Sequence, residues 1–62
     1  MGTRRHRFTS EIEGHRVKVS YDAGTYKNGE VYIESLKRII YGDTWVDAIR
    51  RARRVIKSYA NS

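Results

Sequence analysis

The chain has no cysteine and no proline, and phenylalanine, tryptophan and methionine occur once each. Without cysteine there is no disulfide framework, no thiolate nucleophile and no cysteine-based zinc site, so ordinary packing must hold the fold. No apolar run approaches the roughly 18 residues of a membrane span, and the basic start of the chain lacks the apolar segment of a signal peptide. These absences predict a soluble, cytoplasmic protein.

Negative charge is also scarce, because thirteen Lys and Arg residues stand against seven Asp and Glu residues, for a net charge of +6. This excess favours phosphate backbones, an acidic protein surface or anionic lipid as the partner, and charge alone does not rank them. We expect nucleic acid or an acidic protein surface as the partner, and no membrane. A chain of 62 residues forms one domain with a small core. We expect a basic flexible arm over residues 1–6 and a single domain over residues 7–62.

The alternation of apolar and polar residues predicts a β-hairpin over residues 7–22. The side chains expected on its apolar face are Phe8, Ser10, Ile12, Val17, Val19 and Tyr21. A type II′ turn at Gly14-His15 would place Ile12 opposite Val17. The other face then carries three opposite-charge pairs, Glu13 with Arg16, Glu11 with Lys18 and Arg7 with Asp22. We therefore expect that face to be occupied by its own ion pairs.

A connection over residues 23–29 follows, with a turn signal at Asn28-Gly29. A third strand is expected next, with Val31 and Ile33 pointing inward. Leu36 breaks the alternation, so we expect a bulge or bend near Ser35 before the strand resumes toward residues 39–41.

The last third of the chain predicts an amphipathic helix that opens at Asp43 or Thr44, with Thr44 and Asp47 approximating a capping box. At 100° per residue, one broad apolar face contains Trp45, Ala48, Ile49, Ala52, Val55, Ile56 and Tyr59. A basic stripe on a different side consists of Arg50, Arg53, Arg54 and Lys57. The predicted fold is an α+β two-layer sandwich, a three-stranded antiparallel sheet packed on one C-terminal helix (βββα).

A strand, a Gly-Asp-Thr segment and an aliphatic helix follow one another over residues 36–59. The matching residues are Leu36, Tyr41-Gly42-Asp43-Thr44, Ala48, Ala52, Ile56 and Tyr59. This segment resembles the HicB antitoxin family, in which the comparable segment closes a partial RNase H-like βββα unit, and the resemblance implies neutralisation of a toxin. The architecture is also similar to the three-stranded-sheet-plus-helix DNA-binding domains of tyrosine recombinases and AP2-type plant factors. These domains dock their sheet in the major groove, a mode that a self-paired sheet face does not favour here.

Catalysis is not indicated, because His6 and His15 lie in the arm and in a turn, without a second ligand at a metal-binding spacing. The carboxylate pairs Glu11 with Glu13 and Glu30 with Glu34 could recruit a divalent cation, but salt-bridged side chains are the favoured interpretation. We expect no enzyme activity, no metal and no cofactor.

The expected function is that of a small non-enzymatic regulator that binds nucleic acid, DNA rather than RNA. The candidate binding residues are Arg4, Arg5, Arg7, Arg16, Lys18, Tyr32, Arg50, Arg53, Arg54 and Lys57. Guanidinium groups suit bidentate phosphate recognition, and Tyr32 can stack on a base or anchor a protein interface. The alternative is a protein-interaction module that binds an acidic surface, such as an antitoxin-like neutraliser or a phage-encoded inhibitor of a host nucleic-acid machine (for example an anti-CRISPR-type protein). Exposed sheet edges also allow a homodimer.

Overall fold

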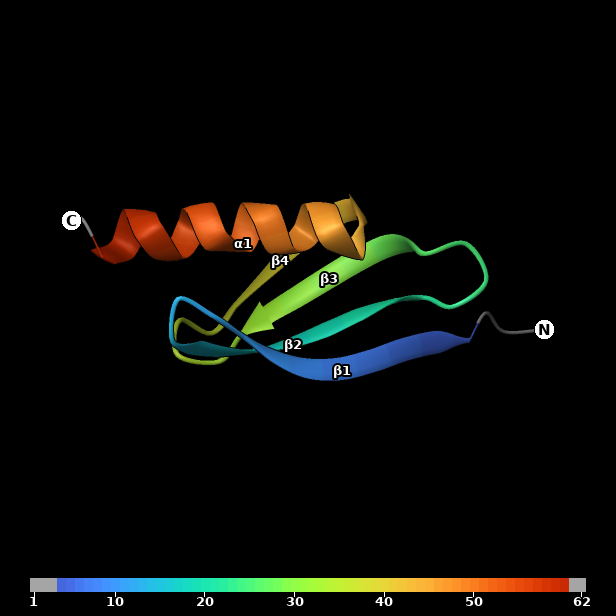
Figure 1. The fold of residues 1–62 in the computed structure, drawn as a ribbon, viewed down its shortest axis with the longest axis horizontal. Helices are drawn as coiled ribbons and strands as arrows, with labels where there is room; N and C mark the ends of the chain where they lie inside the picture. The colour runs from blue at the N-terminus through green and yellow to red at the C-terminus, as the bar shows by residue number, and fades with distance from the viewer. Residues whose placement is uncertain (1–3, 61–62) are drawn as a thin grey trace.

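The computed structural model describes residues 4–60, which form one antiparallel sheet and one helix (Figure 1). The strands are β1 (Arg5–Ile12), β2 (His15–Asp22), β3 (Lys27–Ile33) and β4 (Arg38–Thr44), and they lie side by side in chain order. The helix α1 (Trp45–Ala60) covers one face of this sheet, mainly over β3 and β4. The α+β class with a C-terminal helix is confirmed, whereas the expected number of strands is wrong, because there are four rather than three.

The segment expected to form one bulged strand is instead a hairpin made of β3 and β4. Its loop spans residues 34–37, in which the Leu36 N–H donates to the carbonyl of Ile33 at 3.2 Å and Lys37 has a φ of 52°. The break in alternation at Leu36 is therefore a chain reversal and not a bulge near Ser35. Because β4 starts a new alternation, Ile40 packs against the core while Ile39 and Tyr41 are exposed.

The first hairpin turns one residue earlier than expected, at Glu13-Gly14. Both turn residues have positive φ, 51° and 80°, as a type I′ turn requires. This turn type matches the right-handed twist of the flanking strands, and it pairs Ser10 with Val17 in place of the expected Ile12 with Val17. The register differs by two residues, so every side chain keeps its expected face. The expected charge pairs are wrong, and Glu11 lies opposite Arg16 instead.

The connection between β2 and β3 is also shorter than expected and spans residues 23–26. It is closed by the Tyr26 N–H, which donates to the carbonyl of Asp22 at 2.7 Å. Asn28 and Gly29 therefore do not form the turn that their sequence predicts. They lie within β3, where Gly29 pairs with Gly42 of β4.

The core lies between the sheet and α1. Its buried side chains are Ile12, Val17, Val19, Val31, Ile33, Ala48, Ala52 and Ile56. Thr44 caps the helix, because its Oγ1 accepts a hydrogen bond from the Asp47 N–H at 3.2 Å, as predicted. Tyr59 was expected on the buried face but is 51% exposed, because the last turn of α1 extends past the sheet (Figure 1). Within the described residues, no helix has both the length and the apolar character that crossing a membrane requires.

Candidate nucleic-acid interface

The basic stripe of α1 lies on the solvent-exposed side of the helix. Its members follow one another at i, i+3, i+4 and i+7 from Arg50, and they are centred opposite the buried Ala48, Ala52 and Ile56. Arg50, Arg53, Arg54 and Lys57 are all exposed. The packing of one face of the helix therefore presents these four side chains together on the other face, as the sequence predicted.

The stripe holds its positive charge with little internal compensation. Residues three and four apart on a helix are neighbours, so its four cations repel one another. Among the described residues, the only carboxylate paired with the stripe is that of Glu13, whose Oε1 lies 3.7 Å from the Lys57 Nζ. Both of these side chains are largely in solvent, where such a pair contributes little. The stripe is thus a surface on which bound anions would relieve like-charge repulsion.

Two further arginines lie beside the stripe, and the sequence analysis did not include them. Arg51 donates to the backbone carbonyl of Tyr41 at 3.4 Å, and Arg38 of β4 reaches the hydroxyl of Tyr59 at 3.4 Å. Together with Arg54 and Tyr59, Arg38 lines a small depression at the C-terminal end of α1. The position of Arg38 could not be predicted without β4, because a single bulged strand was expected in place of the β3–β4 hairpin.

The N-terminal arginines do not form the arm that was expected. Residues 1–3 lie outside the described residues, and β1 begins at Arg5 rather than at Arg7. The Arg5 guanidinium contacts Asp22 Oδ1 at 2.8 Å, Ser20 Oγ at 3.1 Å and the Asn28 carbonyl at 2.9 Å. Arg5 is therefore a structural residue that ties β1 to β2 and β3. The side chains of Arg4 and Arg7 remain exposed.

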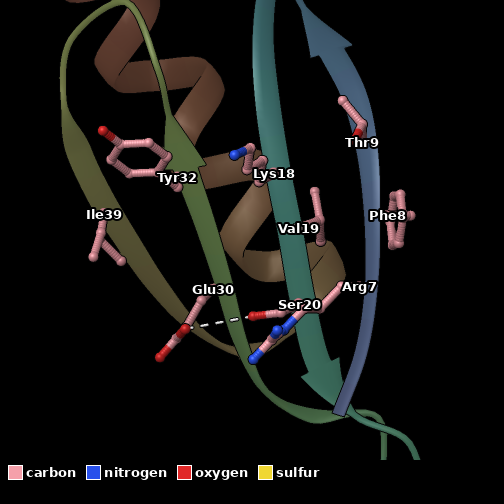
Figure 2. A pocket seen from close by; sticks show the side chains of 9 residues that line it. All are labelled: Arg7, Phe8, Thr9, Lys18, Val19, Ser20, Glu30, Tyr32 and Ile39. Atoms are coloured by element: carbon pink, nitrogen blue, oxygen red, sulfur yellow. Dashed lines mark hydrogen bonds between the residues drawn. The ribbon is translucent and has the colours of Figure 1, made fainter.

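The remaining candidates lie on the uncovered face of the sheet, Lys18 and Tyr32 as Figure 2 shows, and Arg16 by the alternation of side chains along β2. Lys18 is opposite Tyr32 in β3, and Tyr32 is opposite Ile39 in β4. This row crosses a shallow depression of about 370 Å³, which Arg7 also lines. The exposed side chains of Ile39 and Tyr41 belong to the same face. Both were missed because a bulge or bend near Ser35 was expected within one strand, so no face was assigned to residues 39–41.

The aromatic side chains at the start of α1 are structural. Trp45 makes an edge-to-face contact with Phe8, with ring centroids 5.7 Å apart, and lies 5.9 Å from the ring of Tyr21. Tyr21 also stacks on Tyr26 at 5.8 Å. This cluster extends the core beyond the aliphatic residues, in agreement with the place of Trp45 on the apolar face of the predicted helix.

Eight of the ten candidate residues thus lie on opposite sides of the molecule, whose two layers Figure 1 shows. The stripe is on the outer side of α1, whereas Arg7, Arg16, Lys18 and Tyr32 are on the face of the sheet that α1 leaves uncovered. The two surfaces must be treated as separate candidate interfaces.

Comparison with known proteins adds no further assignment. No family model, curated protein or solved structure matches this chain. Within residues 4–60, no group of three or more His, Asp or Glu side chains is arranged to hold a metal ion. The geometry of the two surfaces is therefore the basis for a functional proposal.

Proposed function

We propose that this protein is a small non-enzymatic regulator that binds nucleic acid through the stripe of α1, in the cytoplasm. The observation that carries the proposal is the row of four exposed cations on the side of the helix opposite its buried residues. Five of the thirteen Lys and Arg residues lie in α1, against one carboxylate, that of Asp47. Such a concentration of charge on one face suits the phosphate backbone of a nucleic acid.

The chemistry of the stripe is that of phosphate recognition. Three of its four members are arginines, whose guanidinium groups donate paired hydrogen bonds to phosphate oxygens. Arg50 and Lys57, the ends of the stripe, are seven residues apart in the sequence, or about 10 Å along the axis at the helical rise of about 1.5 Å per residue. Duplex DNA is the favoured ligand, since its major groove admits a helix and the deep, narrow major groove of duplex RNA does not. Phosphate contacts carry no sequence information, so the binding is expected to be sequence-independent.

The test is a titration of a fluorescent DNA duplex at about 50 mM salt with a charge-reversal variant, Arg50→Glu with Arg54→Glu. We expect this variant to bind at least tenfold more weakly than the native protein, because it removes two phosphate contacts and adds repulsion. The matched control is Lys27→Glu with Lys37→Glu, which changes the net charge equally at exposed positions away from the stripe. An equal loss in both variants, or no binding of nucleic acid by the native protein, would contradict the proposal.

An acidic protein surface offers carboxylates to the same arginines and is the second candidate partner. The HicB-like resemblance of residues 36–59 favours an acidic protein partner, because the resemblance implies an antitoxin-like neutraliser. An inhibitor of a nucleic-acid machine would bind such a partner in the same way. Capture from a nuclease-treated lysate separates the two candidates. A protein that stays bound after nuclease treatment, and is lost with Arg50→Glu and Arg54→Glu, would favour this partner over nucleic acid.

A homodimer is proposed only through the β1 edge of the sheet. The other edge, β4, has its Tyr41 carbonyl engaged by Arg51, whereas β1 lies at the opposite margin of the sheet. Unpaired backbone groups at a strand edge can pair with a second chain. Sedimentation equilibrium at high protein concentration would test for the homodimer, and a monomeric mass would contradict it.

A further inference from the structure

The face of the sheet that α1 leaves uncovered carries exposed aromatic and aliphatic side chains. Ile39 is 51% exposed and Tyr41 60% exposed, and Tyr32 lies beside them on β3. Tyr32 and Tyr41 are diagonal neighbours on adjacent strands, a relationship that places side chains about 7–8 Å apart. The fold does not need these rings for its core, which lies on the other face of the sheet.

Cations lie beside this apolar strip, on the neighbouring strands. Arg7 extends across β2 in Figure 2, and Lys18 lies directly opposite Tyr32. Arg16 is on the same face of β2, two residues before Lys18. Among the described residues, none of these three cations has an ion pair.

Two carboxylates of this face, those of Asp22 and Glu30, are already engaged by Arg5, while Glu11 lies opposite Arg16 at the far end of β1. Asp22 pairs with Arg5 at 2.8 Å, and Glu30 lies 3.8 Å from the same guanidinium. Glu30 also accepts a hydrogen bond from the Ser20 hydroxyl at 3.4 Å (Figure 2). The sequence had predicted that Arg7 would neutralise Asp22. Because Arg5 does so instead, Arg7 is left available to an external anion.

We infer that this face is a second binding surface, which takes an unpaired nucleic-acid strand. Tyr32 and Tyr41 would stack on bases, while Arg7, Arg16 and Lys18 contact the phosphates. Aromatic platforms flanked by cations are how single strands are bound without sequence preference. A duplex cannot use the tyrosines, because its base faces are stacked on one another. The inference is independent of the α1 stripe, which lies on the opposite side of the molecule.

The arrangement of the face matches the two chemical parts of a single strand. Its apolar half, on β3 and β4, meets the bases, and its cationic half, on β1 and β2, meets the backbone. The shallow depression of about 370 Å³ spans both halves. Two layers with separate surfaces would also allow one molecule to hold a duplex on α1 and an unpaired strand on the sheet.

The experiment measures the affinity of the full chain for a fluorescent oligothymidine of about 12 nucleotides and for a duplex at the same salt concentration. The test variant is Tyr32→Leu with Tyr41→Leu, which keeps apolar side chains and removes both rings. Since one stacked base is worth about tenfold in affinity, we expect at least a tenfold loss for oligothymidine and less than a twofold change for the duplex. Tyr26→Leu is the matched control, because Tyr26 is also 60% exposed but lies outside this face.

The outcomes separate this inference from the proposed function. The variant Arg50→Glu with Arg54→Glu should lose the duplex and keep most of its affinity for oligothymidine, which is the reverse of the tyrosine variant. Unchanged oligothymidine binding by the tyrosine variant overturns the inference and leaves the α1 proposal intact. A native dimer that dissociates when both tyrosines are replaced would assign the face to a second copy of the chain. If the tyrosine variant loses an acidic protein partner but still binds oligothymidine, the uncovered sheet face binds protein and not a nucleic-acid strand.

Discussion

Gly29 and Gly42 lie directly opposite each other on β3 and β4, beneath the first turn of α1. A Cβ atom on Gly29 would meet backbone atoms of Thr44 and Trp45 at under 3.0 Å, and one on Gly42 would lie 2.5 Å from the Ala48 backbone nitrogen. Neither glycine lies in a turn, although the sequence predicted a turn at Asn28-Gly29. Together they let the chain pass from β4 into α1 while the helix stays against the sheet.

Gly42→Ala is expected to destabilise the fold by about 1–3 kcal/mol, the usual cost of overpacking. The clash is with backbone, so no side chain can move aside. Urea unfolding followed by Trp45 fluorescence measures the change. The control is Gly24→Ala, where an added Cβ meets nothing within 4 Å. Equal stability of the two variants would show that the helix does not approach β4 this closely.

Thr44→Ala is expected to lower the free energy of unfolding by about 1 kcal/mol, because the Asp47 N–H loses its capping acceptor. Thr44→Ser keeps a hydroxyl at this position and should lose much less. Thermal unfolding by circular dichroism compares the three proteins. If serine costs as much as alanine, the hydroxyl is not the source of the stabilisation.

Glu13→Asn is expected to stabilise the first hairpin by several tenths of a kcal/mol. Glu13 has a φ of 51°, a left-handed conformation that asparagine tolerates better than glutamate, and Asn-Gly is a preferred type I′ turn. Glu13→Gln is the matched control, since it removes the same charge and keeps the unfavourable conformation. Equal stabilisation by both variants would show that the lost charge, and not the turn conformation, is the cause.

Tyr21→Leu is expected to destabilise the fold by about 1–2 kcal/mol. Its ring contacts Phe8, Tyr26 and Trp45, and aromatic pairs are worth about 0.5–1.5 kcal/mol beyond the area that they bury. Tyr41→Leu, at a position 60% exposed, is expected to leave stability nearly unchanged. Urea denaturation of both variants measures the difference, and a larger loss for Tyr41→Leu would contradict this division of roles.

The salt dependence of duplex binding should report the number of phosphate contacts. Each contact contributes about 0.9 to the slope of log K against log salt for duplex DNA, so Arg53→Gln should reduce the slope by about that amount. Arg16→Gln removes a cation from the uncovered sheet face and should leave the duplex slope unchanged. Fluorescence titrations between about 50 and 200 mM salt measure both slopes, and equal reductions would mean that the two surfaces bind the duplex together.

Local patterns predicted the features that repeat with a fixed period along the chain, although not the positions of the turns. The alternation around Val17 and Val19 assigned the faces of the first hairpin, and Thr44 marked the start of the helix. Spacings of three and four residues placed Arg50 and Arg54 on the side of the helix opposite Ala52. These assignments hold because side-chain direction repeats with a fixed local period in strands and helices.

Local patterns did not predict the features that depend on how one strand pairs with another. Two hairpin registers that differ by two residues expose the same faces, so alternation could not decide whether Arg5 or Arg7 pairs with Asp22. The break at Leu36 fits both a bulge and a chain reversal, and only the pairing of β4 with β3 distinguishes them.

The amino-acid sequence alone therefore specified the secondary-structure faces, the capped helix and its basic stripe, because each arises from local geometry and periodic burial. The tertiary structure added the fourth strand, the exposed strip that includes Tyr32 and Tyr41, and the separation of the cations into two opposed surfaces. These features depend on turn geometry and on contacts between segments distant in the chain, and no local period encodes them.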